Sequence, residues 1–367
     1  MRERLTDSME TVPELMVMQE MPKPRKTFLL QRGNYDTPGE QVFPNTPESI
    51  LPFPKNLPKN RYGLALWLTN PKNPLTARVA VNRLWQNLLG VGLVKTSDDF
   101  GNQGEMPSHP ELLDWLAVTF RESGWNIKKM NKMIVLSATY RQDSQTAKNT
   151  REKDPENRLL ARGPAYRMSA EMIRDNALMA SGLLNRKIGG KSVKPYQPDG
   201  LWEINSMTYV PDSGAAIYRR SLYVIVKRSV PNPTLATFDA PSRSYCMVRR
   251  QSTNTPLQAL VTLNDPTFIE ASRVLGAQMC QIADSRQGIS QVYRKLTGRR
   301  IAKAELELLN TMQQAQVKKF RQQPAKQKGW LTIGQYRAVK SMDQALLAAN
   351  TVVANTILNS DASLTKR

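Results

Sequence analysis

Hydrophobic residues recur along most of this chain at the three- and four-residue spacing of amphipathic helices. The pattern predicts helices over 61–69, 75–89, 110–122, 128–139, 169–184, 256–263, 265–282, 301–320 and 336–358. Strand-like segments are fewer: 26–32, and the pair 206–210 and 218–226, which turn-forming residues join. The predicted fold class is therefore mainly α, with a small antiparallel hairpin near 206–226.

Prolines divide the chain into two parts. Six of them fall between Pro38 and Pro58, and such a stretch favours an extended conformation. We therefore expect residues 1–60 to form an extended N-terminal segment and 61–367 to form one large, mainly helical domain. A chain of 367 residues is long enough to bury a substantial core.

Histidine and cysteine are scarce. His109 is the one histidine, and Cys246 and Cys280 are the two cysteines. This composition excludes zinc sites built from Cys and His, covalent haem attachment through Cys-x-x-Cys-His and a disulfide framework. No metal site is expected, and the two thiols are expected to be buried apolar groups. Catalysis would depend on carboxylates, Lys, Tyr or an imported cofactor.

The net charge indicates an anionic partner. Lys and Arg number 52 against 31 Asp and Glu, a formal charge of +21. Between Gln291 and Lys340 there are 12 basic and 2 acidic residues, within a basic helical C-terminal part, 286–367. Nucleic acid, an anionic membrane surface and acidic polysaccharide are all compatible with this charge. Aromatic residues suited to base stacking are sparse, so nucleic acid ranks last. No apolar run is long enough for a transmembrane segment.

The densest polar group of residues lies between two carboxylates, Asp239 and Asp265. Arginines and helix-start residues separate them: Arg243, Arg249, Arg250, Thr253 and Asn254. One interpretation is a pocket for a carboxylate, sulfate or polyol, in which the arginines bind and a carboxylate acts as general base. The other is structural: Arg–Asp pairs hold loops to helices, and Thr255 and Asp265 cap them.

A second candidate set lies on the helix predicted over 169–184. Glu171, Arg174 and Asp175 share one face at i, i+3 and i+4. The two carboxylates could perform acid–base chemistry if their environments separate their pKa values, or they could simply hold the arginine. Trp202 follows a Pro/Gly loop and is a candidate for stacking against a sugar ring.

Several longer motifs, in order, resemble one known family. They are Asn70–Trp85, Asp99–Gly101, Pro107–Leu116, Gln197–Trp202, Tyr218–Tyr223, Phe238–Arg243, Arg249–Leu260 and Leu263–Pro266. This set resembles the domain of unknown function 1553, a domain associated with Planctomycete-type cytochrome c proteins. The resemblance is strongest over 61–275, and residues 1–60 resemble the tail that links an upstream domain to this one.

The resemblance implies no established activity. Larger members are exported and carry a haem c domain upstream, so it implies an exported or periplasmic location and a haem c-bearing partner domain or protein. This chain has no haem motif, and no apolar stretch follows its first residues. We therefore expect no cofactor in this chain and no signal peptide.

Two functions follow from these observations. The first is a binding module that acts with a haem c-bearing or cell-surface partner, an acidic glycan, or both. The alternative is a polysaccharide-acting enzyme, a hydrolase or haem-linked oxidoreductase, that uses Asp239, Asp265, Glu171 or Asp175. A deep pocket that collects these side chains would favour the enzyme, whereas a closed network among them would favour the module.

Overall fold

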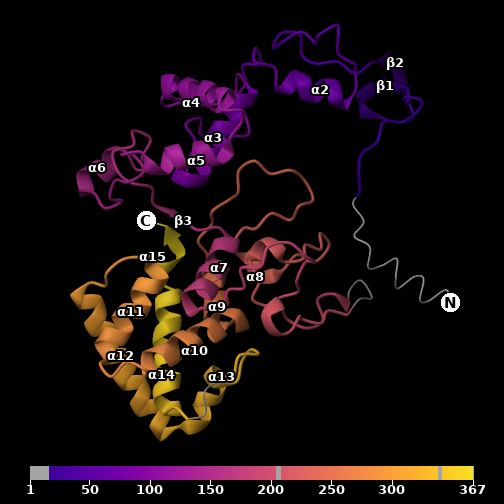
Figure 1. Ribbon diagram of the computed structural model, residues 1–367. Helices are drawn as coiled ribbons and strands as arrows, with labels where there is room; N and C mark the ends of the chain where they lie inside the picture. The colour runs from indigo at the N-terminus through magenta and orange to yellow at the C-terminus, as the bar shows by residue number, and fades with distance from the viewer. Residues whose placement is uncertain (1–15, 204–207, 338–340, 367) are drawn as a thin grey trace, which may run out of the picture. The chain divides into compact units, whose positions relative to one another are not determined.

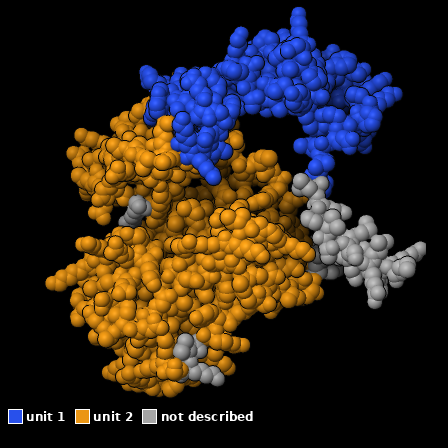
Figure 2. All heavy atoms as spheres, in the orientation of Figure 1, with its two compact units in different colours: residues 1–81, 110–130 blue, residues 82–109, 131–367 orange. Residues whose placement is uncertain are grey.

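The computed structural model describes residues 16–203, 208–337 and 341–366, and it is mainly helical, as the sequence predicts (Figure 1). Two short antiparallel sheets are formed within these residues. β1 (Thr27–Leu30) pairs with β2 (Pro38–Val42), and β3 (Tyr166–Arg167) pairs with β4 (Thr365–Lys366). The chain divides into two compact units, residues 1–81 with 110–130 and residues 82–109 with 131–367 (Figure 2).

The first unit contains the β1–β2 hairpin, α2 (Arg61–Leu68), α4 (Pro110–Glu122) and parts of α3 (Thr76–Leu89) and α5 (Ile127–Leu136). Its proline-rich segment is anchored to α2. The indole N–H of Trp67 donates to the carbonyl oxygen of Leu51 at 2.8 Å. Gly63 is required here, because a Cβ at this position would meet the carbonyl oxygen of Pro58 at 1.9 Å.

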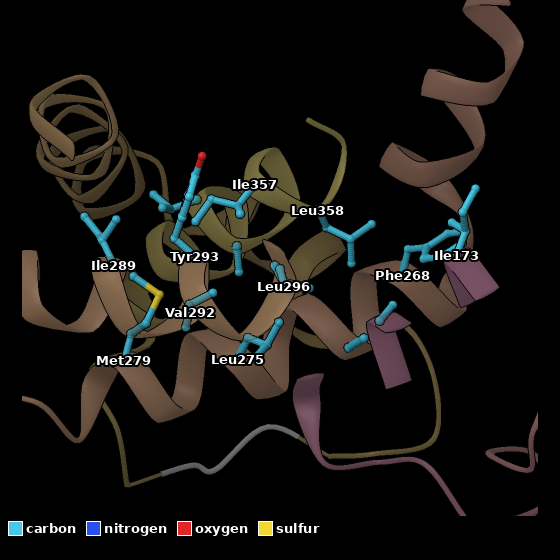
Figure 3. Close-up of a cluster of buried hydrophobic side chains, with 14 of the residues drawn as sticks. Ile173, Phe268, Leu275, Met279, Ile289, Val292, Tyr293, Leu296, Ile357 and Leu358 are labelled. Atoms are coloured by element: carbon cyan, nitrogen blue, oxygen red, sulfur yellow. The ribbon is translucent and has the colours of Figure 1, made fainter. Parts of the chain in front are cut away.

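The second unit is built around two packed helices, α10 (Pro266–Cys280) and α14 (Gln344–Leu358). Around them lie α7 (Ala170–Ser181), α11 (Ser285–Thr297) and α12 (Lys303–Gln322), whose apolar side chains converge in one core (Figure 3). Small residues allow the central helices to approach closely. A Cβ at Gly276 would meet the backbone nitrogen of Thr351 at 2.8 Å.

Shorter elements surround this core. They are α6 (Lys148–Lys153), α8 (Pro233–Thr237), α9 (Pro256–Asn264), α13 (Lys328–Leu331), α15 (Asp361–Leu364) and the 3-10 turns η1 (Gln31–Gly33), η3 (Gly214–Ala216), η4 (Ser221–Tyr223) and η5 (Pro324–Gln327). Of these, α8 and α9 position the predicted site, because the long loop between them carries its arginines (Figure 1).

The hairpin predicted near 206–226 is wrong for the residues that the structure describes; 206 and 207 lie outside them. Residues 208–226 contain the turns η3 and η4, and two isolated parallel bridges, Asn185 to Arg219 and Val193 to Val224, contact this segment. The backbone of the predicted strand 218–226 has other partners. The Arg174 guanidinium donates to the carbonyl oxygen of Arg219, and Val193 exchanges backbone hydrogen bonds with Tyr223 and Ile225.

The last helix also begins later than predicted. It starts after Asp343, whose carboxylate caps the backbone N–H groups of Ala345 and Leu346, and not at Tyr336. Residues 338–340 of the predicted helix lie outside the described part. The backbone N–H of Tyr336 donates instead to the carboxylate of Glu270, so this segment is held by tertiary contacts.

Candidate functional site

The α7 carboxylates are each engaged with a partner from a distant segment. Glu171 forms an ion pair with Arg250 at 2.6 Å, and Asp175 accepts from the backbone N–H and hydroxyl of Ser221 at 2.8 and 2.7 Å. Burial alone would raise the pKa of Glu171, but the Arg250 guanidinium and hydrogen bonds from the backbone N–H of Glu171 and from Ser169 together hold that pKa below its ordinary value. Glu171 therefore favours the ionised, acceptor-only state, and the Asp175 carboxylate is occupied by its two donors from Ser221.

Arg174, between these carboxylates on α7, is fully buried and acts as a structural clamp. Its guanidinium donates to the carbonyl oxygens of Arg219 at 2.9 Å and Ile217 at 2.7 Å, and to the hydroxyl of Ser221 at 3.2 Å. The shared face predicted from the sequence exists, but its arginine points into the protein. It is thus a scaffold for residues 217–221.

Asp239 lies at the centre of a closed network. Its carboxylate accepts from the Arg167 guanidinium at 2.5 Å and from the backbone N–H and hydroxyl of Thr253 at 2.9 Å each. Arg167 also donates to the carbonyl oxygen of Thr253 and, at 2.7 Å, to the amide oxygen of Gln258. The Gln258 amide nitrogen donates to the carbonyl oxygen of Thr237 at 2.9 Å. We call these residues the neck clamp.

The electrostatics of the neck clamp fix its charge state. The Arg167 and Asp239 side chains are each 15% exposed. Burial raises the pKa of Asp239, but hydrogen bonds from Thr253 and Arg167 lower it by more than burial raises it. The pKa of Asp239 therefore lies below its ordinary value of 3.8. A carboxylate held this way is ionised at neutral pH and has its acceptor positions occupied. Asp239 also has a left-handed backbone, φ +62°, which turns the chain into the loop.

Asp265, the other predicted general base, starts a helix. It is the N-cap residue of α10 and accepts from the backbone N–H of Thr267 at 2.8 Å. Its second carboxylate oxygen accepts from the hydroxyl of Thr234. Asp265 therefore joins α8 to α10, and both of its carboxylate oxygens accept hydrogen bonds that stabilise the fold.

The arginine loop, residues 240–252, is exposed over most of its length. Of its three arginines, Arg250 is tied to Glu171, while Arg243 and Arg249 form no ion pair with any carboxylate of the described residues. Asn254, just beyond the loop, is also exposed. Arg243 lines a cavity of about 40 Å³ together with Glu171, Ser221 and apolar residues of α8. Substrate pockets enclose roughly 300–1,000 Å³, so this cavity is too small for a sugar.

Trp202, the candidate for sugar stacking, is buried. It is 4% exposed, and its ring packs edge-on against Tyr209 with 4.9 Å between centroids. The ammonium groups of Lys194 and Lys227 lie 5.6 and 4.3 Å from its centroid. Lysines thus occupy the ring surface that a sugar would need.

A family model described as a protein of unknown function (DUF1553, PSD1) matches residues 60–313. The chain belongs to this family. The match includes α7, the neck clamp and the whole arginine loop. No curated protein and no solved structure matches the chain. Within the described part of this DUF1553 chain, no helix has the length and apolar character needed to cross a bilayer, and no three His, Cys, Asp or Glu side chains gather as metal ligands would.

Two residues of the DUF1553 site escaped the sequence analysis, Arg167 and Gln258. Arg167 lies on β3, whose partner β4 is at the C-terminal end of the chain, and 72 positions separate it from Asp239. No local pattern marks such a residue. Gln258 carried a signal, because glutamine at the third position after Thr255 is typical of a capping box. Its further role in the neck clamp depends on tertiary structure.

Proposed function

We propose that this DUF1553 chain is an interaction module that binds an acidic protein partner through the arginine loop. The observation that carries the proposal is an asymmetry in the site. All four candidate carboxylates are engaged inside the protein, whereas Arg243 and Arg249 are exposed without a carboxylate partner. Unpaired arginines on a surface favour recognition of carboxylates, which they bind in bidentate geometry.

The neck clamp supports a binding role because it holds both ends of the loop. Asp239 precedes the loop and Thr253 follows it, and hydrogen bonds of 2.9 Å join them directly. The Arg250–Glu171 ion pair ties the loop to α7 at a third point. A loop fixed at its base loses less conformational entropy on binding than a free one. This arrangement is typical of recognition loops on rigid scaffolds.

The composition of the loop favours a protein over a glycan as its partner. Tyr245 is 69% exposed and Met247 is also exposed, beside the three arginines. Leu257 and Leu260 follow on α9, 55% and 56% exposed. Residues 240–264 contain no Lys, Asp or Glu. Enrichment in Tyr, Met and Arg with depletion of Lys and acidic residues is characteristic of protein–protein interfaces.

The same geometry gives less support to the alternative, a polysaccharide-acting enzyme. Acid–base catalysis requires a carboxylate that can exchange a proton with substrate in a pocket. Here the cavity beside Glu171 and Arg243 is about 40 Å³, and Asp239 is enclosed by donors. A haem c-bearing protein, which the family resemblance implies, is the first natural partner to examine.

The test uses a fluorescent 20-residue peptide with Glu and Leu at helical spacing, and a scrambled peptide of equal composition. We expect the full chain to bind the first peptide more tightly, and Arg243→Ala/Arg249→Ala to reduce its affinity about tenfold, which corresponds to about 1.4 kcal/mol for the pair. Arg141→Ala/Arg151→Ala, two exposed arginines elsewhere, is the charge-matched control. Equal losses in both variants, or equal binding of both peptides, would contradict the proposal.

A further inference from the structure

A second cationic region lies far along the chain from the arginine loop. Residues 308–342 contain no Asp or Glu, but they contain seven Lys or Arg and seven Gln. The region covers the second half of α12, η5 and α13. Its positive charge is therefore not balanced by neighbours in sequence, and its most common polar side chain is an amide.

Part of this region forms a shallow groove along α12. The groove is open, has a volume of about 400 Å³ and is lined by Gln313, Gln314, Val317, Lys318, Arg321 and Gln322. Positions 314, 318 and 322 follow one another at four-residue intervals, so their side chains form a row on one helix face. At about 1.5 Å per residue this row is roughly 12 Å long. We call this feature the α12 groove.

The groove is built on the core. Gln313, at its floor, is buried and donates to the side-chain oxygen of Asn350 on α14 at 2.5 Å. Phe320, two helical turns beyond Gln313 on the same buried face of α12, packs in a cluster with Ala345, Ala348 and Ala349. Arg321 pairs at 3.1 Å with Asp343, the N-cap residue of α14, and its side chain remains 65% exposed. The helix that carries the groove residues is thus held against the core.

We infer that the α12 groove binds an anionic polysaccharide, a ligand distinct from the acidic protein proposed for the arginine loop. Lys318 and Arg321 supply charge for carboxylate or sulfate groups. Gln314 and Gln322 supply amides, each of which can donate to and accept from sugar hydroxyl groups. Carboxylated and sulfated chains share this chemistry, and the test separates them.

The surroundings of the groove favour polysaccharide over other polyanions. Its lining holds no aromatic residue, and Phe320 is buried, so the lining residues offer no stacking surface for the bases of a single strand. Val317 is the one apolar residue in the lining, too little for insertion of the helix into a lipid surface. The groove lining therefore offers amide and cationic groups with little apolar surface, which suits a ligand that carries many hydroxyl groups and negative charges.

The experiment measures binding of the full chain to three fluorescent probes at roughly physiological salt. The probes are a galacturonate oligosaccharide, a heparin oligosaccharide and a DNA duplex, with neutral dextran as reference. We expect one or both acidic oligosaccharides to bind more tightly than the duplex. Lys318→Gln/Arg321→Gln should reduce that affinity about tenfold, because it removes the two charge-assisted donors to the carboxylate or sulfate groups.

Two controls separate recognition from general attraction. Lys128→Gln/Lys129→Gln removes the same charge from exposed positions on α5, and it should change affinity less than twofold. Gln314→Ala removes no charge and should still weaken oligosaccharide binding about threefold, whereas Gln323→Ala, just outside the groove lining, should not. Equal losses in the two double variants, no effect of Gln314→Ala, or tighter binding of the duplex would overturn the inference. Arg243→Ala/Arg249→Ala should leave oligosaccharide binding unchanged, so this result is independent of the proposed function.

Discussion

The two cationic surfaces of this DUF1553 chain differ in chemistry although they share a sign of charge. The arginine loop combines Arg with Tyr, Met and the leucines of α9, and it contains no Lys. The α12 groove combines Lys, Arg and Gln on one regular helix, with a single apolar residue in its lining. The first set is typical of protein interfaces and the second of surfaces that bind hydroxyl-rich anions. A net charge of +21 therefore describes at least two different kinds of surface.

The two surfaces also differ in what holds them. The arginine loop depends on the neck clamp, whose members come from β3, the end of α8 and the start of α9. The groove depends on the local hydrogen bonds of α12 and on its packing against α14. Loop residues also fall within the family match, which ends at residue 313, whereas most groove residues follow it. We therefore expect different substitutions to abolish ligand binding at each of the two surfaces.

Substitution of Arg167 should lower the free energy of unfolding more than the other substitutions. It should also distinguish the two surfaces most clearly, because only one of them depends on the neck clamp. Arg167→Ala removes the cationic partner of Asp239 and the donor to the Gln258 amide oxygen. We expect the free energy of unfolding to fall by about 3 kcal/mol, as for other largely buried ion pairs broken on one side. Urea denaturation measures this change. Peptide binding by the loop should be lost while oligosaccharide binding persists.

Arg167→Lys serves as the matched control, because it keeps the charge but not the forked geometry. It should lie between the wild type and the alanine variant in both stability and peptide affinity. A wild-type urea midpoint for Arg167→Ala would show that the neck clamp does not hold the loop.

Removal of the Asp239 charge should have a smaller, pH-dependent effect. Because the folded-state pKa of Asp239 is depressed, its contribution is fully present above its ordinary pKa of 3.8 and is lost as pH falls through the lower folded-state value. We expect Asp239→Asn to cost about 1–2 kcal/mol at pH 7. The difference from wild type should shrink below about pH 4.

Thermal or urea unfolding at pH 3 to 7 measures this difference between the two proteins. Asp361→Asn offers a comparison at a carboxylate outside the neck clamp, on α15. A difference that stays constant from pH 7 to pH 3 would show that Asp239 is not held ionised by Arg167 and Thr253.

The leucines of α9 should show the smallest effect on stability. Leu257→Ala/Leu260→Ala removes exposed side chains, so we expect the free energy of unfolding to change by no more than about 0.5 kcal/mol per site. Affinity for the acidic amphipathic peptide should fall roughly threefold, and affinity for oligosaccharide should not change. A large loss of stability would mean that these leucines serve the fold and not a partner.

Local signals in the sequence predicted the helix boundaries of this site and could not predict its network. The capping residues Thr255 and Asp265, each followed by proline, start α9 and α10 as expected. The ion pair between Arg250 and Glu171 spans 79 positions, a separation over which periodicity carries no information. The helix α11 falls within the C-terminal part expected to be helical, 286–367, but its bounds were not predicted, although Asp284 caps its start and Gly298 ends it with a left-handed backbone.

The same distinction explains the wrong hairpin. Residues 218–226 are rich in β-formers, but Arg174 takes up the carbonyl oxygen of Arg219, and the backbone of Val193 pairs with Tyr223 and Ile225. Arg174 lies 45 positions before Arg219. Contacts over such a separation override local β propensity, which is weak and depends on context. Hydrogen bonds between residues distant in sequence therefore explain why the hairpin does not form and why the candidate carboxylates are occupied by donors within the protein.

The most direct test of this account measures both ligands on both double variants in one series. The account predicts that Arg243→Ala/Arg249→Ala loses the acidic peptide and retains the acidic oligosaccharide, while Lys318→Gln/Arg321→Gln shows the reverse, each loss about tenfold. If each variant weakened both ligands equally, the two surfaces would be one undifferentiated field of positive charge, and the central claim would be wrong.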